Sequence, residues 1–273
     1  MNRFSSFAKS VIPLILALII QLASTIAIAF ITTSNGKYAT FSTAMSKLAH
    51  SNYIHHANLL YGVIALIIFV PWYLKQFVSK DLKEKRKIPS GFSIHTVLSL
   101  LILGFGLQFL AVVIVNKLSD FFTEAVNTYE SSMNISGYNL TLKTIVLIYV
   151  IILAPIVEET IFRGLIFRCA KNSVGFPIAN LWQAALFGVF HLNIAQGVYA
   201  FVIGLILGWV VQRGHAIRYS ILLHIIFNLL GCIAFTFFSG VAILAPVASI
   251  VVIVLLIFFS LWVYYTDFIP EKA

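Results

Sequence analysis

The stretch LAPIVEETIFRGLIFR, residues 153–168, places two adjacent glutamates and an arginine inside a run of apolar side chains. Each ionisable group at the centre of a membrane-spanning helix costs about 2.5–3.5 kcal/mol, so such groups are retained where they are paired or serve a function. Glu158 and Glu159 are also the only Asp or Glu residues between positions 131 and 266. This isolation makes the pair the starting point for a functional prediction.

The composition around this stretch is that of a membrane protein. Of 273 residues, 60% are hydrophobic and 10% are charged, whereas a soluble domain carries about 25% charged residues. Apolar runs of about 20 residues recur along the chain, and each is long enough to cross a bilayer as a helix. The sequence therefore predicts an all-α, polytopic transmembrane helical bundle of about eight spans. The expected spans are 11–31, 57–74, 96–115, 143–169, 178–192, 197–212, 218–239 and 241–264.

The charges predict the orientation of these spans. The segment KQFVSKDLKEKRKIPSG, residues 75–91, is rich in Lys and Arg, and such clusters stay in the cytoplasm. With eight spans both termini are then cytoplasmic, and 13 of the 18 Lys and Arg residues fall on that side, four on the other and one within a span. The segment either only sets topology or also gathers anionic lipid or an acidic substrate tail. No basic stripe with interleaved aromatic residues is present, so nucleic acid is not an expected partner.

Helix geometry gives the two glutamates different roles. Neighbouring residues point about 100° apart on an α-helix, so Glu158 and Glu159 cannot share a face. Glu159 and Arg163 are four residues apart and do share one, with Glu in the favourable N-terminal position. Glu158 is left without a charged partner on its own helix. An unpaired carboxylate in an apolar site is suited to general-base work, so Glu158 is the candidate base and Glu159 with Arg163 its support.

Two further polar motifs lie in later apolar segments. FGVFHLN, residues 187–193, places Phe187 and His191 four apart, and HIIFN, residues 224–228, does the same for His224 and Asn228. A single histidine in an apolar helix is commonly a packing residue, but three polar sites on three spans must face one another or a wet cavity, since lipid offers them no partner. At 1.5 Å per residue, Glu158, His191 and Asn228 lie roughly 16, 20 and 15 Å from the cytoplasmic ends of their spans. The three motifs are therefore expected to meet in one pocket.

Taken in order, E-E-x-x-x-R, F-x-x-x-H and H-x-x-x-N resemble the motifs of the CPBP family, over about residues 145 to 232. The name stands for CAAX proteases and bacteriocin-processing proteins, also called the Abi family or type II CAAX prenyl endopeptidases. The resemblance implies an intramembrane protease in which Glu158 activates a water together with His191. It also implies that His224 and Asn228 stabilise the oxyanion.

The resemblance also implies a division of the chain, a substrate and a location. Residues 143–239 are the expected catalytic core, residues 1–142 the N-terminal transmembrane helices and loops, and residues 240–273 a C-terminal transmembrane helix and short tail. Eukaryotic members remove the C-terminal tripeptide of prenylated proteins, whereas bacterial relatives are linked to peptide maturation, bacteriocin immunity or regulation at the cell surface. We therefore expect a peptide or protein substrate, lipidated or not, and contact with membrane lipids. The compact layout favours a bacterial cell membrane.

Two other interpretations stay open. Glu158, His191 and His224 could supply a carboxylate and two imidazoles to Zn²⁺, although the H-E-x-x-H pattern of preorganised zinc proteases is missing; the cofactor prediction is none. Intramembrane Glu, Arg and His also build proton relays, so the chain could be a non-catalytic immunity or transport protein. Transporters usually contain paired broken helices in two halves, and no such pairing is visible in the sequence.

Overall fold

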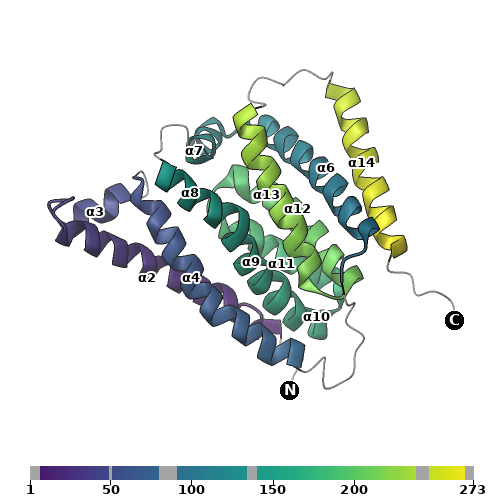
Figure 1. The fold of residues 1–273 in the computed structure, drawn as a ribbon, viewed down its shortest axis with the longest axis horizontal. Helices are drawn as coiled ribbons and strands as arrows, with labels where there is room; N and C mark the ends of the chain where they lie inside the picture. The colour runs from purple at the N-terminus through teal and green to yellow at the C-terminus, as the bar shows by residue number, and fades with distance from the viewer. Residues whose placement is uncertain (1–6, 49–50, 80–90, 134–139, 238–245, 268–273) are drawn as a thin grey trace.

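The protein is described by a computed structural model, which covers residues 7–48, 51–79, 91–133, 140–237 and 246–267 (Figure 1). These residues are almost entirely helical and contain no strand. The α-helices are α2 (Ile12–Ser34), α3 (Phe41–Leu48), α4 (Tyr53–Tyr73), α6 (Ile94–Ser119), α7 (Thr123–Met133), α8 (Leu140–Ile148), α9 (Ala154–Glu159), α10 (Arg168–Val174), α11 (Phe176–Phe190), α12 (Ile194–Gly214), α13 (Ile217–Phe237) and α14 (Pro246–Asp267). Three π-helical segments join some of them, namely η1 (Leu74–Val78), η2 (Tyr149–Leu153) and η3 (Thr160–Phe167).

The predicted membrane bundle is confirmed. Among the described residues, five helices are long and apolar enough to cross a membrane: Phe7–Ser34, Tyr53–Val78, Ile94–Ser119, Leu140–Val174 and Ile194–Gly214. Three shorter apolar helices correspond to the remaining predicted spans: Phe176–Phe190, Ile217–Ile233 and Ile253–Asp267. The chain is therefore an integral membrane protein. Most of the basic segment used to predict orientation lies in residues 80–90, outside the described residues.

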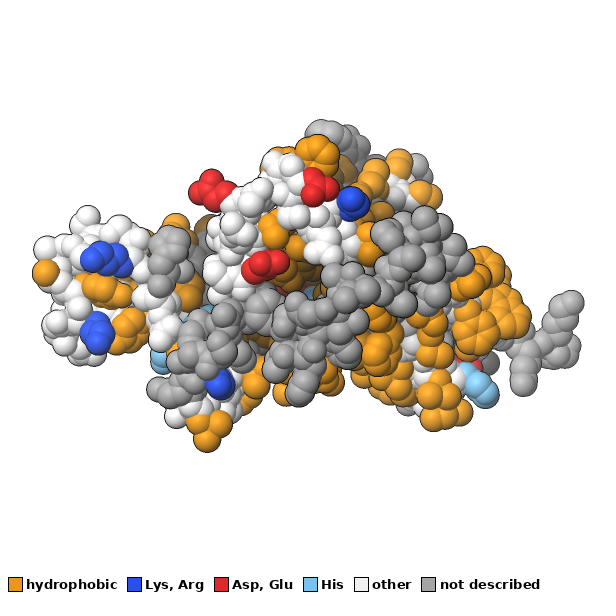
Figure 2. Space-filling view, turned by 90° about the horizontal axis from the view of Figure 1, so that it is seen from above, with side chains coloured by type: hydrophobic (Ala, Val, Ile, Leu, Met, Phe, Trp, Pro, Cys, Tyr) orange, Lys and Arg blue, Asp and Glu red, His pale blue; other side chains and the backbone are white. Residues whose placement is uncertain are grey.

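Two helices of the structure have no counterpart among the predicted spans. Both α3 and α7 are short and rich in Ser and Thr or in charged residues, so a search for apolar runs passes over them. Helix α7 is held against the start of α12, because the Asn193 side-chain amide donates to the Ala125 carbonyl at 3.0 Å and the hydroxyls of Tyr199 and Tyr129 lie 3.3 Å apart. Figure 2 shows the face that carries α7, where Asp and Glu side chains gather beside a hollow.

The helices are arranged with the three polar motifs at the centre of the bundle. In Figure 1, α2 and α4 lie at one side and α6 and α14 at the other, with α9 to α13 between them. The start of the first span meets the middle of α11, since the Trp182 indole N–H donates to Ser10 Oγ at 3.1 Å. The end of α14 meets the start of α6 through the bond from Ser93 Oγ to Asp267, 2.5 Å long.

The helix that carries the two glutamates is wound irregularly on both sides of them. Helix α9 begins with Pro155 near its first position and ends at Glu159, with η2 before it and η3 after it. Proline has no backbone N–H, so the carbonyl four residues earlier loses its α-helical donor. Wider π turns are frequent at functional sites. Here they shift the register of the helix where its carboxylates face the bundle interior.

Small residues, among them Gly204 and Gly208 of α12, let α11 and α12 approach closely. A Cβ atom added to Gly208 would lie 1.9 Å from Asn180 Oδ1, and one added to Gly204 would lie 3.1 Å from the Ala184 Cβ. Gly188 and Gly197 face each other in the same way, with 2.7 Å from an added Cβ on Gly188 to the Gly197 carbonyl oxygen. This contact presses α11, with its histidine, onto the centre of the bundle.

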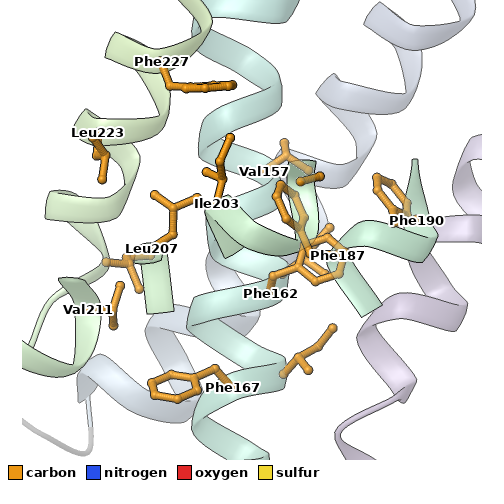
Figure 3. Close-up of a cluster of buried hydrophobic side chains, with 14 of the residues drawn as sticks. Val157, Phe162, Phe167, Phe187, Phe190, Ile203, Leu207, Val211, Leu223 and Phe227 are labelled. Atoms are coloured by element: carbon orange, nitrogen blue, oxygen red, sulfur yellow. The ribbon is translucent and has the colours of Figure 1, made fainter. Parts of the chain in front are cut away.

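The interior around these helices is a continuous apolar core. Figure 3 shows part of it, where side chains from α9, η3, α11, α12 and α13 pack together. The labelled residues are Val157, Phe162, Phe167, Phe187, Phe190, Ile203, Leu207, Val211, Leu223 and Phe227. Polar side chains buried in such surroundings need partners within the protein, and the candidate site consists largely of those partnerships.

Candidate active site

The predicted pair of Glu159 and Arg163 is present and fully buried. Arg163 Nη1 donates to Glu159 Oε1 at 2.8 Å, and neither side chain is exposed at all. The guanidinium also donates through Nη2 to the Gly204 carbonyl at 3.3 Å and lies 4.3 Å from the centre of the Phe187 ring. Arginine forms planar, multiply bonded contacts of this kind where lysine cannot. The pair thus links the glutamate helix to both α11 and α12.

His224 joins the two glutamates. Its Nδ1 lies 2.9 Å from Glu159 Oε1, and its Nε2 lies 3.8 Å from Glu158 Oε2. An ionised carboxylate can only accept hydrogen bonds, so Nδ1 carries the proton in the bond to Glu159. Its other nitrogen, Nε2, is therefore directed toward Glu158. The two carboxylates point in different directions on their helix, yet one imidazole contacts both.

Glu158 has fewer hydrogen-bond partners than Glu159. It makes no hydrogen bond to any residue that the structure describes, and its side chain keeps 12% of its surface exposed, compared with 0% for Glu159. The 3.8 Å between Glu158 Oε2 and His224 Nε2 is longer than a hydrogen bond. The expected division, in which Glu159 is occupied and Glu158 is left for chemistry, agrees with this geometry.

His191 is placed at the end of α11, beside Phe187. Its Nδ1 lies 2.8 Å from the Phe187 carbonyl oxygen, and the two rings meet edge to face with centroids 4.9 Å apart. The next residue, Leu192, has a φ of 54°, a backbone conformation that residues other than glycine rarely adopt. The chain reverses here from α11 into α12. This tight turn fixes the position from which His191 Nε2 can act.

Phe187 connects the histidines to the ion pair. Its ring lies edge to face against His224, with centroids 5.9 Å apart, in addition to its contacts with His191 and Arg163. His191 and His224 also interact electrostatically. The structure therefore brings the first two motifs and His224 together around one aromatic ring.

Asn228 lies one turn beyond His224 on α13 and bonds to a different segment. Its Nδ2 donates to the Val150 carbonyl at 2.7 Å, within the π-helical η2. Its amide has a second N–H and an oxygen that this bond does not use. Asn228 thus fastens α13 to the irregular turn that precedes α9.

Several buried polar residues near the site were not among its predicted members. The Gln183 side chain donates to the Gly204 carbonyl at 2.8 Å and to Asn180 Oδ1 at 2.9 Å, which extends the polar contacts of Arg163 along the α11–α12 interface. Asn193 caps α12 by accepting from the Gln196 N–H at 3.1 Å. The bonds of Gln183 and Asn193 therefore hold helices together.

Tyrosines also surround Glu158, and apolar periodicity alone gave no reason to select them. Tyr61 of α4, Tyr149 of η2 and Tyr199 of α12 each interact electrostatically with this carboxylate. A phenol in an otherwise apolar stripe is a signal that could have identified them, because a buried hydroxyl needs a partner.

The residues were also tested for their fit to a metal ion. Within the described part of the chain, no group of three or more His, Cys, Asp or Glu side chains is placed so that it could hold one. Nδ1 of His191 bonds to the Phe187 carbonyl and Nδ1 of His224 to Glu159, so Nε2 is the nitrogen that each histidine leaves for other partners. The zinc alternative for Glu158, His191 and His224 therefore stays a prediction, to be tested by chelation.

Comparison with known protein families found a match over the region that contains the site. Residues 140–230 match the family model described as type II CAAX prenyl endopeptidase Rce1-like, a region that contains all three motifs. Searches of curated proteins and of solved structures found no match to the chain. The Rce1-like family is a protease family, so the protein is an enzyme of the peptidase class that acts on a peptide or protein substrate. Over residues 140–230, the chain is therefore similar to the Rce1-like family of type II CAAX prenyl endopeptidases.

Proposed function

We propose that the protein hydrolyses a peptide bond of a membrane-associated substrate with a water activated by Glu158. The proposal rests on one observation: the two adjacent glutamates differ in their hydrogen bonding. Glu159 is bonded to both Arg163 and His224, while Glu158 makes no hydrogen bond to a described residue and faces His224 Nε2 at 3.8 Å. Both bonds of Glu159 are made to Oε1, and its Oε2 is completely buried without a partner among the described residues. Glu158 keeps 12% of its side-chain surface exposed, so of the two carboxylates it is the one that water can reach.

The reaction then follows from the roles of the side chains. Glu158 removes a proton from water, with His191 positioning that water, and the hydroxide attacks the carbonyl carbon of the scissile bond. The carbonyl oxygen becomes an oxyanion and accepts hydrogen bonds from His224 Nε2, in its protonated form, and from the unused N–H of Asn228. As the carbon–nitrogen bond breaks, Glu158 returns its proton to the leaving amine.

Glu159 and Arg163 support this chemistry without touching the substrate. Glu159 accepts from His224 Nδ1 and so fixes which nitrogen is presented to the reacting atoms, and its negative charge favours the imidazolium that the oxyanion needs. Arg163 balances that charge when no substrate is bound. An acid–base residue held by a buried carboxylate in this way is a recurring arrangement in hydrolases.

We further propose that the substrate is a peptide matured or inactivated at a bacterial cell membrane, with lipidated peptides as one class to be tested. Support comes from the family, whose name refers to prenylated CAAX sequences, and from the position of the site within the bundle. The core of the enzyme is proposed to be residues 143–239, with flanking membrane segments at 1–142 and 240–273.

The test is a cleavage assay on purified protein in detergent or lipid, with a peptide pool that includes a farnesylated CAAX peptide. Wild type is compared with Glu158→Gln, each with and without a chelator. We expect cleavage by wild type that persists under chelation and is lost in Glu158→Gln. Loss under chelation with recovery on adding Zn²⁺ would favour the zinc-dependent alternative, and full biological activity of Glu158→Gln in the host would favour a non-catalytic immunity or transport role.

A further inference from the structure

Tyr61 occupies an unusual place on α4. The buried face of this helix repeats every four residues, at Ala57, Tyr61, Ala65 and Phe69. Tyr61 is 2% exposed, so the whole phenol lies inside the bundle. Its neighbours along the face are apolar, and the spacing is that of a helix packing its face against others. A phenylalanine would fill nearly the same space.

The Tyr61 hydroxyl has no hydrogen-bond partner among the described residues. A buried hydroxyl without a partner loses its bonds to water and gains nothing in return, which destabilises the folded chain. The usual explanation for such a group in a native protein is a water, ion or ligand that completes the bond. Tyr199, which also lies near Glu158, differs on this point because its hydroxyl is paired with that of Tyr129 at 3.3 Å.

The surroundings of the Tyr61 hydroxyl belong to the candidate active site. The Tyr61 ring lies 6.4 Å from that of Phe190, the residue before His191. Its neighbour Gly62 is pressed against η2, where an added Cβ would lie 2.6 Å from Leu153 Cδ2 and 3.2 Å from Tyr149 Cε2. The hydroxyl interacts electrostatically with Glu158 and Tyr149. Tyr61 is thus enclosed by the segments that immediately precede both Glu158 and His191.

A cavity of about 230 Å³ lies farther out along the same pair of helices. It opens between the starts of α4 and α8, one to two turns from Tyr61 and Tyr149. Most of the surface that lines it is apolar, but four of the lining residues carry polar groups. These groups can bond to a peptide backbone, whose polar groups need partners within a membrane. The lining residues are Asn52, Tyr53, His56, Thr141, Leu142 and Ile145.

We infer that Tyr61 is a substrate-binding residue, whose hydroxyl donates a hydrogen bond to a backbone carbonyl of the peptide held beside Glu158. This inference rests on the proposed function. It adds to the site a residue from α4, outside the region 140–230 that matches the family. The peptide approaches along the cleft between α4 and α8, and its backbone supplies the acceptor that the hydroxyl otherwise does not have.

The test compares Tyr61→Phe with Tyr199→Phe, which removes a hydroxyl that already has a partner in the protein. KM and kcat are measured for the peptide that wild type cleaves fastest. The dissociation constant of a farnesylated CAAX peptide is measured separately, with Tyr61→Phe placed on a Glu158→Gln background that cannot turn it over. Melting temperatures in detergent are recorded for every variant, since a purely structural tyrosine would lower them when changed.

We expect Tyr61→Phe to raise KM, and the dissociation constant, by roughly 3- to 10-fold, the change that one neutral hydrogen bond produces. Its kcat should stay near wild type, and its melting temperature should stay the same or rise, because the unpartnered buried hydroxyl is removed. Unchanged KM and dissociation constant, or a lower melting temperature as the main effect, would overturn the inference while leaving Glu158-dependent cleavage in place. Failure of wild type to cleave any peptide would count against the proposed function instead, and the binding measurement would still decide the role of Tyr61.

Discussion

Replacing Glu159 by Gln should destabilise the protein far more than the same replacement at Glu158. Glu159 is completely buried and accepts charge-assisted bonds of 2.8 Å from Arg163 and 2.9 Å from His224. Glutamine keeps the shape of the side chain but removes the charge, so the buried Arg163 loses its counter-ion. Removing one member of a buried ion pair typically costs about 3–5 kcal/mol. At about 2–4 °C per kcal/mol for a chain of this size, the melting temperature should fall by roughly 6–20 °C.

Glu158→Gln is the matched control because it makes the same chemical change one residue earlier. Glu158 makes no hydrogen bond to a described residue and keeps some exposure. A change that breaks no contact usually costs little stability, so the melting temperature of the Glu158→Gln variant should stay within a few degrees of wild type. Thermal unfolding in detergent, followed by intrinsic tryptophan fluorescence, measures both. Equal melting temperatures for the two variants would refute the assignment of Glu159 to structure and Glu158 to chemistry.

Three other predictions concern the scaffold. Gly208→Ala should lower the free energy of unfolding by about 1–3 kcal/mol, because its methyl group would meet Asn180 Oδ1 at 1.9 Å; a neutral result in thermal unfolding would contradict the close α11–α12 contact. Asn193→Ala should cost about 1 kcal/mol through the lost cap of α12, whereas Asn193→Ser should retain most of it. Burial and nearby Lys and Arg side chains lower the pKa of His215 below its ordinary value of 6.5. Just below pH 6.5 the unfolded chain therefore binds more protons than the folded chain, so the free energy of unfolding should rise with pH in that range. His215→Gln should remove that part of the slope in melting curves recorded at several pH values.

The sequence was sufficient to predict the spans because each is a long apolar run. All eight predicted spans correspond to apolar helices, with ends shifted by a few residues. Helices α3 and α7 carry no such signal, and the π-helical turns around α9 depend on backbone hydrogen bonding that residue patterns do not specify. The Glu159–Arg163 pair was predictable because it is formed within one turn of a single helix.

Contacts between helices were predicted less completely. Residue spacing placed Glu158, His191 and Asn228 at similar depths, but it could not show that His224 would contact both glutamates. Nor could it show that Asn228 would bond to the Val150 carbonyl, which lies 78 residues away in the chain. These contacts depend on helix rotation and register, which are set by packing against neighbours such as the glycine face of α12. The roles assigned to the site residues in catalysis remain predictions.

The most direct test of the account is cleavage in water enriched in ¹⁸O. Purified wild type and Glu158→Gln are incubated with the peptide pool, and the products are examined by mass spectrometry. The account predicts that wild type yields a new C-terminal carboxyl group containing one ¹⁸O atom, with chelator present or absent, and that Glu158→Gln yields none. Cleavage by Glu158→Gln at the wild-type rate would contradict the claim that Glu158 activates the water.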